Sequence, residues 1–267
     1  MQYYPVFLGS IAKSLPSTTV YAIGHLGQSL TTASEDPSAV ATLREQVEAK
    51  IQFVDQLDEE YGFVKGKNGE GKVNLVLMGH SVGAWICCEV RSVISTPSLM
   101  MYRRFCGQVI KARPKLVSSI HLLFPTLSRM ALSPNGIPLI RYGSSLLPVL
   151  GAFSSAFSYL PTSVMTRIVG VVTSQQAVGA KVTTGLVTSP AVVRNALSMA
   201  REEMDQIVEL DRETLKEFGG RMRFYHAEHD GWVLESCIEV SHISLYVNSL
   251  RSDAVLISLC FRIFIKL

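Results

Sequence analysis

The chain has 267 residues, of which 48% are hydrophobic and 18% charged, and its formal net charge is +3. This length suits one large α/β domain with a substantial core, and so small and dispersed a charge argues against a nucleic-acid partner. The five cysteines are odd in number and lack metal-ligand spacing, so we expect free thiols in a reducing compartment and neither a metal nor a cofactor.

The first part of the chain alternates between helix-like and strand-like segments. Residues 3–15 are compatible with a short helix that ends before Pro16, and residues 18–24 have the β-branched and aromatic composition of a strand. His25 follows this strand, where a structural hydrogen bond is a simpler role than a place at the edge of a site. Residues 38–61 carry apolar side chains at helical spacing and therefore predict an amphipathic helix.

An apolar run at 73–78 leads into Gly79-His80-Ser81-Val82-Gly83, and a helix-compatible segment follows. The pattern Gly-x-Ser-x-Gly between a strand and a helix indicates a nucleophile elbow, which projects the serine hydroxyl clear of a sheet. Glycines are required because side chains at those two positions would collide with neighbouring backbone. The N–H of Val82 would lie at a helix N-terminus and face an oxyanion. An ordinary strand–turn–helix loop is the alternative.

The elbow is followed by a predicted helix at 84–94 and a predicted buried strand at 115–124. His121 lies inside this second strand, where a core or edge histidine is a simpler interpretation than a catalytic one. Strands that alternate with helices in this way are typical of a parallel α/β sheet.

Residues 128–181 differ in composition from the rest of the chain, and we predict a cap inserted at about 128–200. Between Tyr142 and Ala180 the single charged residue is Arg167. Pro148 and Pro161 interrupt the helical pattern, and no run reaches the roughly 20 apolar residues that a spanning helix needs. We expect an apolar helical cap that roofs the site or lies in a lipid surface, with packing wholly onto the core as the alternative.

After the cap, residues 195–217 predict an amphipathic helix and residues 221–227 a strand. Asp230 follows this late strand, which is where a hydrolase triad places its carboxylate. Asp205 and Asp211 are weaker candidates because they belong to a charged helix face.

The triad order in this fold is serine, then acid, then histidine, so His226 and His229 precede the acid and do not qualify. His242 is the only histidine after Asp230 and is the candidate general base. Without a base, a serine hydroxyl is a weak nucleophile at neutral pH.

The sequence resembles the lipid droplet-associated hydrolases, a branch of the α/β-hydrolase superfamily. The resemblance extends over 1–233 and rests on four segments. These are Ile23-Gly24-His25-Leu26-Gly27, the elbow with Ala84-Trp85, the stretch 121–136 from His-Leu-Leu-Phe-Pro-Thr to Ser-Pro-Asn-Gly, and His229-Asp230-Gly231-Trp232-Val233.

The resemblance implies a single α/β-hydrolase domain over 1–267, with a mostly parallel sheet flanked by helices and an apolar cap insertion. It also implies a serine esterase that cleaves lipid or sterol esters with Ser81 as nucleophile and Asp230 as acid. Its partners would be the lipid ester and the lipid droplet monolayer. Its location would be the cytosolic face of lipid droplets, with the endoplasmic reticulum as a second location.

The two ends of the chain depart from the family pattern. A Pro-Gly-Asn-Pro-Gly segment that supplies part of the oxyanion region has no counterpart before Tyr3, and a Pro-His-Ala-Phe-like segment with the catalytic histidine has none after Asp230. Residues 244–267 form an atypical tail without a helical pattern. We therefore expect a domain that is incomplete at both ends. A catalytically impaired protein that binds the droplet surface is the alternative function.

Overall fold

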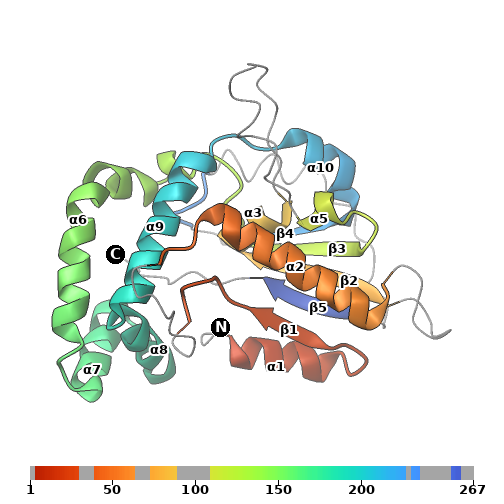
Figure 1. Cartoon of the computed structure of the whole chain (residues 1–267). Coiled ribbons are helices and arrows are strands. Elements are labelled where there is room, and N and C mark those ends of the chain that lie inside the picture. Colours follow the sequence, from red (N-terminus) through yellow and green to blue (C-terminus); the bar gives the residue numbers. More distant parts are fainter. Residues whose placement is uncertain are drawn as a thin grey trace.

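A computed structural model describes residues 4–29, 39–63, 73–88, 109–226, 230–234 and 254–259. Within these ranges five strands form one parallel sheet in the order β1-β5-β2-β3-β4, with helices on both sides (Figure 1). The strands are β1 (Val20–Ile23), β2 (Asn74–His80), β3 (Val117–Leu123), β4 (Met222–Tyr225) and β5 (Ala254–Leu259). The predicted α/β class, a parallel sheet flanked by helices, is confirmed.

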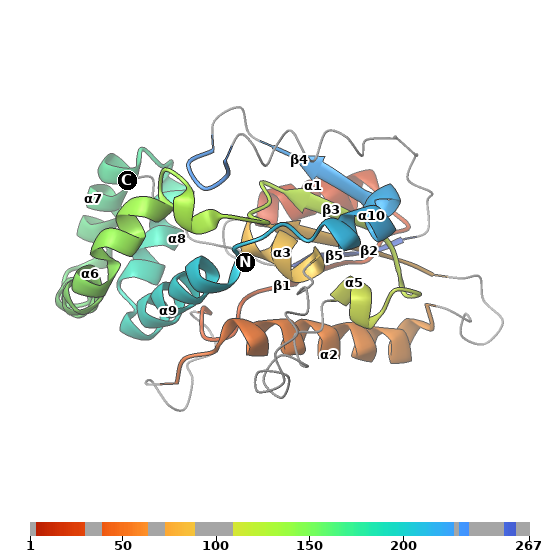
Figure 2. The same cartoon turned by 90° about the horizontal axis from the view of Figure 1, so that it is seen from above.

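The helices lie in two groups, around the sheet and beyond its carboxyl edge. Around the sheet are α1 (Pro5–Ser14), α2 (Leu43–Tyr61), α3 (Val82–Cys88), α5 (Val109–Ala112) and α10 (Arg212–Phe218). Beyond the edge are α6 (Gly136–Phe157), α7 (Thr162–Thr173), α8 (Ala177–Val187) and α9 (Pro190–Gln206), which we call the cap. Figure 2 shows α1 and α2 on opposite sides of the sheet and the cap beyond one end of it.

Helix α2 begins at Leu43 rather than near residue 38, because Thr42 caps it. The Thr42 hydroxyl accepts a hydrogen bond from the Glu45 N–H at 3.2 Å, and the Thr42 N–H donates to the Glu45 carboxylate at 2.7 Å. This reciprocal capping box satisfies two donors that a helix start leaves without partners. The Glu45 carboxylate accepts hydrogen bonds from the Thr42 N–H and from the Thr42 hydroxyl, the latter at 2.7 Å, and both bonds lower the pKa of Glu45.

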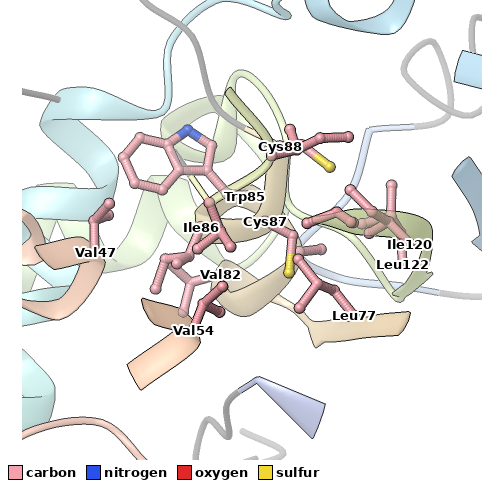
Figure 3. Close-up of a cluster of buried hydrophobic side chains, with 14 of the residues drawn as sticks. Val47, Val54, Leu77, Val82, Trp85, Ile86, Cys87, Cys88, Ile120 and Leu122 are labelled. Carbon is pink, nitrogen blue, oxygen red and sulfur yellow. The ribbon is translucent and has the colours of Figure 1, made fainter. Parts of the chain in front are cut away.

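Strand β2 supplies the centre of the core because successive side chains point to opposite faces of a sheet. Leu75 and Leu77 face α2 and α3, whereas Val76 and Met78 pack with Ile11 of α1. Figure 3 shows the larger cluster, in which valines of α2 meet Trp85 and other side chains of α3. Burying one such large apolar side chain contributes about 1.5–3 kcal/mol to folding. The core therefore holds the elbow between β2 and α3 in place.

Two of the cysteines predicted as free thiols, Cys87 and Cys88, lie buried in this cluster, and neither forms a disulfide. Burial raises the pKa of the Cys88 thiol, and nearby Asp211 raises it further. Both groups are therefore packing residues, and the remaining cysteines lie outside the described residues.

The cap departs from the sequence prediction at Pro148. Helix α6 continues through this proline, whereas Pro161 does separate α6 from α7, as predicted. A proline removes one backbone donor and disturbs one turn, and α6 continues on both sides of that turn. In the described ranges, no helix combines the length and apolar character that crossing a membrane requires.

The predicted single helix at 195–217 is wrong, because the structure divides this segment into α9 and α10. Helix α9 ends at Gln206, and Asp211 caps the start of α10 by accepting a hydrogen bond from the Thr214 N–H at 2.9 Å. An Asp side chain competes for backbone donors and so favours a cap over a helix interior.

Part of the tail that showed no helical pattern in the sequence forms strand β5, which pairs in parallel with β1 on one side and β2 on the other. A central strand of a parallel sheet is apolar throughout and shows no polar alternation. This explains why the run in 254–259 carried no period that would identify it as a strand. Residues 244–253 and 260–267 lie outside the described residues.

Candidate active site

Ser81 occupies the turn between β2 and α3 with a left-handed backbone, φ +54°. Its N–H donates to the Leu123 carbonyl at 2.9 Å, and its own carbonyl accepts from the Ala84 N–H at 3.0 Å. Left-handed φ is uncommon for a residue other than glycine, and strain of this kind is typical of functional sites. The backbone geometry of the predicted nucleophile elbow is therefore present at Ser81.

Gly79 explains why the elbow requires a glycine. A Cβ atom at this position would lie 2.4 Å from the Gly83 carbonyl oxygen and 2.6 Å from the Ala84 nitrogen, both backbone atoms. Strand β2 and helix α3 can approach this closely only without that atom. The first residue of α3 is Val82, whose N–H belongs to the first turn, where helical donors lack an intrahelical acceptor. Its place in the first turn leaves Val82 as the predicted candidate for an oxyanion donor.

Aromatic residues surround His80 of the elbow, and sequence reasoning missed them. The buried His80 ring has its centroid 5.8 Å from that of Tyr4 and 5.6 Å from that of Phe124. Phe124 is itself left-handed, with φ +47°, and its N–H donates to the Tyr225 carbonyl at 2.8 Å. A bulky residue with positive φ is an outlier, so Phe124 marks a second constrained position at this edge of the sheet.

Asp230 lies beyond the same edge of the sheet as Ser81. His80 pairs with Leu123, and Leu123 pairs with Tyr225, so the carboxyl ends of β2, β3 and β4 are in one row. Neighbouring strands lie about 4.8 Å apart, so the segments after β2 and β4 begin roughly 10 Å apart.

The Asp230 carboxylate is oriented by its own turn, because its Oδ1 accepts a hydrogen bond from the Trp232 N–H at 2.8 Å. The turn also binds the segment before the cap, where the Asn135 N–H donates to the Gly231 carbonyl at 2.9 Å. Sequence reasoning did not identify Asn135 as part of the site. Its position in the Ser-Pro-Asn-Gly motif was the available signal.

His121 and His25 pack and hydrogen-bond within the fold, as predicted from the sequence. His121 stacks on Tyr225, and its Nδ1 lies 3.1 Å from the Tyr225 hydroxyl. Burial lowers the pKa of His121, and the charge of Arg223 lowers it further. His25 is buried after β1, and its carbonyl accepts from the Gln28 N–H. His242, the candidate base, lies outside the described residues, as does His229.

Helix α9 fastens the cap to the core near the site. Asn195 donates to the Ala39 carbonyl at 3.1 Å and accepts from the Ala41 N–H at 3.0 Å, and Glu202 accepts from the Leu43 N–H at 2.7 Å. A Cβ atom on Gly27, in the loop after β1, would lie 2.3 Å from the Asn195 amide oxygen. The cap is therefore held against the carboxyl edge of the sheet, where Ser81 and Asp230 lie.

Comparison with known proteins identifies similar sequences. A family model described as lipid-droplet associated hydrolase matches residues 1–246. Proteins named lipid droplet-associated hydrolase are similar in Drosophila melanogaster (26% identical, covering 86% of this chain and 70% of that protein) and in Mus musculus (28%, covering 86% and 67%). One from Gallus gallus is 28% identical over 86% of this chain and 66% of its own length. The chain thus spans about two thirds of the length of these relatives.

Proposed function

Because the chain belongs to the lipid-droplet associated hydrolase family, we propose that it hydrolyses lipid or sterol esters on lipid droplets with Ser81 as the nucleophile. The observation that carries this proposal is the left-handed turn of Ser81 at the carboxyl edge of a parallel sheet. Asp230 is the acid, supported by its place beyond β4 at the same edge. His242 is the one histidine after it in the sequence and takes the role of the base.

The reaction assigned to these residues is acyl transfer in two steps. The Ser81 oxygen attacks the ester carbonyl carbon while the base takes its proton, and the Val82 N–H donates to the resulting oxyanion. Collapse of this intermediate expels the alcohol, which takes the proton back from the imidazolium, and leaves an acyl group on Ser81. Water activated by the same base then releases the carboxylic acid. Asp230 orients the imidazole and stabilises its charged form.

Replacing Ser81 by alanine should abolish covalent labelling by a fluorophosphonate probe and reduce ester hydrolysis to the background of the assay, because no oxygen remains to be acylated. Gel fluorescence of the purified chain and mass mapping of the modified peptide measure the labelling. Ser10→Ala on the exposed side of α1 is the matched control and should leave labelling unchanged. Equal labelling of wild type and Ser81→Ala would refute the nucleophile.

The proposed place of action is the droplet monolayer on its cytosolic face, with the endoplasmic reticulum as a second location. Support comes from the cap, where α7 and α8 expose Val171 (81%), Val172 (71%) and Val178 (75%), and where Tyr159 precedes α7 with 88% of its surface exposed. Exposed apolar side chains concentrated on one part of a protein are typical of lipid or protein contact surfaces. Figure 1 shows the cap helices α6 to α9 together beyond one end of the sheet.

The triple substitution of Val171, Val172 and Val178 by glutamate should prevent binding to triolein droplets coated with phosphatidylcholine. Transfer of three exposed valines from water into the lipid contributes several kcal/mol, so the bound fraction should fall by about 100-fold or more. Flotation of the purified protein with the droplets measures this. Val6→Glu on α1, whose side chain is equally exposed, is the control and should still bind. Unchanged flotation of the triple variant would contradict the proposed surface.

The second candidate is a droplet-surface protein without catalysis, favoured by the same exposed cap, since this surface functions without a triad. Under this alternative the triple glutamate variant disperses from droplets, whereas Ser81→Ala changes neither binding nor any measured hydrolysis. The two experiments together separate the two functions.

A further inference from the structure

Asn135 occupies the position that precedes α6, but it does not cap that helix with its side chain. Asparagine is favoured at such positions because its side chain accepts a backbone hydrogen bond from the first turn. Here Ser133 serves the turn instead. Its buried hydroxyl donates to the Met130 carbonyl at 2.7 Å and accepts from the Gly136 N–H at 3.0 Å. Capping therefore does not account for the side chain of Asn135.

The side chain of Asn135 lies against the backbone of the turn at 230–232, which carries Asp230 and which we call the acid loop. A Cβ atom built on Gly231 would be 2.4 Å from the Asn135 Nδ2 atom and 2.8 Å from its Cγ atom. The backbone of Asn135 also donates to the Gly231 carbonyl at 2.9 Å. Gly231 stands between Asp230 and the Trp232 N–H that the Asp230 carboxylate accepts. Asn135 thus contacts the loop at the residue next to the proposed acid.

The turn that presents Asn135 is joined to both ends of the cap. It leads directly into α6, and just before it the N–H groups of Arg129 and Met130 donate to the carbonyls of Val208 and Ile207, which follow α9. A Cβ atom on Gly136 would lie 2.0 Å from the Met130 carbonyl oxygen, so the turn is closely packed. The place of the cap and the place of the acid loop are therefore set by one compact piece of backbone.

We propose that Asn135 is a positioning residue for Asp230. Its side chain, packed on Gly231, fixes the position of the acid loop relative to the turn at 133–136 and hence relative to the cap. The inference rests on the proposed role of Asp230. The carboxylate must face the base within a fraction of an ångström to stabilise the imidazolium, and a displacement of about 1 Å costs on the order of 100-fold in rate. Asn135 acts through Gly231 and touches neither the substrate nor the reacting atoms.

A double-mutant cycle between Gly231 and Asn135 tests this contact. Gly231 does not have positive φ, so Gly231→Ala adds a methyl group that the backbone accepts and that meets the Asn135 side chain. The second-order rate of fluorophosphonate labelling of Ser81 should fall by about 10- to 100-fold in Gly231→Ala. In the background of Asn135→Gly, which removes the obstacle at little cost to the helix start, the same alanine should change the rate by less than threefold.

Two further measurements separate positioning from loss of fold. The acidic limb of the pH–rate profile for labelling should move to lower pH in Gly231→Ala and in the milder Asn135→Ala, because a displaced carboxylate stabilises the imidazolium less and the pKa of the base falls. Gly220→Ala places a methyl group in open space before β4 and is the control, with rate and profile unchanged. Urea unfolding of every variant confirms that it is folded under the assay conditions.

The outcomes distinguish this inference from the proposed function. Equal cost of the alanine with and without the Asn135 side chain, or an unshifted pH profile in both Gly231→Ala and Asn135→Ala, would overturn the inference alone. A wild-type chain that the probe does not label would overturn the proposed function, and the role of Asn135 with it.

Discussion

Asp230→Asn should lower the rate of ester hydrolysis by about 10⁴-fold, which is the typical consequence of replacing the acid of a serine triad by its amide. The amide oxygen can still accept the hydrogen bond from the Trp232 N–H, so the turn keeps its shape. The substitution removes the negative charge that stabilises the imidazolium. It also removes the carboxylate that selects the catalytic tautomer of the imidazole. Hydrolysis of a soluble p-nitrophenyl ester by the purified variant measures the loss.

Asp205→Asn provides the matched control for Asp230→Asn. Asp205 is an exposed carboxylate on α9, and its replacement changes the net charge by the same amount at a position away from the elbow. The control should retain the wild-type rate. A loss of less than about tenfold in Asp230→Asn would remove Asp230 from the triad, because such an effect is within the range of a general electrostatic change.

Gly79→Ala should both destabilise the protein and disable the elbow. The added Cβ atom would lie 2.4 Å from the Gly83 carbonyl oxygen, which is a backbone atom that cannot rotate away, so β2 and α3 must separate. Overpacking of this kind costs about 1–3 kcal/mol of unfolding free energy. Separation also opens the turn that holds Ser81, and a displacement of about 1 Å lowers the labelling rate on the order of 100-fold.

Urea unfolding and fluorophosphonate labelling, performed on the same preparation, measure the two effects of Gly79→Ala. Gly9→Ala in α1 is the control, since a Cβ atom at Gly9 meets no neighbour within 4 Å. An alanine in a helix interior is more favourable than a glycine by about 0.5–1 kcal/mol, so the control should be at least as stable as the wild type. A Gly79→Ala variant with wild-type stability and labelling would contradict the close approach of β2 and α3.

Local patterns in the sequence were sufficient for the elbow and for most of the sheet. The conformations of Gly79 and Ser81 follow from steric rules that act within a few residues, and the apolar runs before Ser81 and around His121 indicate strands by composition alone. The same holds for Pro161, which separates two helices. The effects of Pro148 and Asp211 were harder to predict from the sequence. Whether a helix continues through a proline, or ends before an aspartate, depends on the conformation of the flanking residues.

The tertiary structure decided what residues far apart in the chain do to each other. No local pattern relates Asn135 to Gly231, Asn195 to Gly27, or the run at 254–259 to the gap between β1 and β2. These contacts depend on which strand pairs with which and on where the cap helices meet the edge of the sheet. Spacing along a chain encodes the local geometry of a turn or a helix face, whereas contacts between segments are selected by the packing of the whole core, which only the folded chain defines.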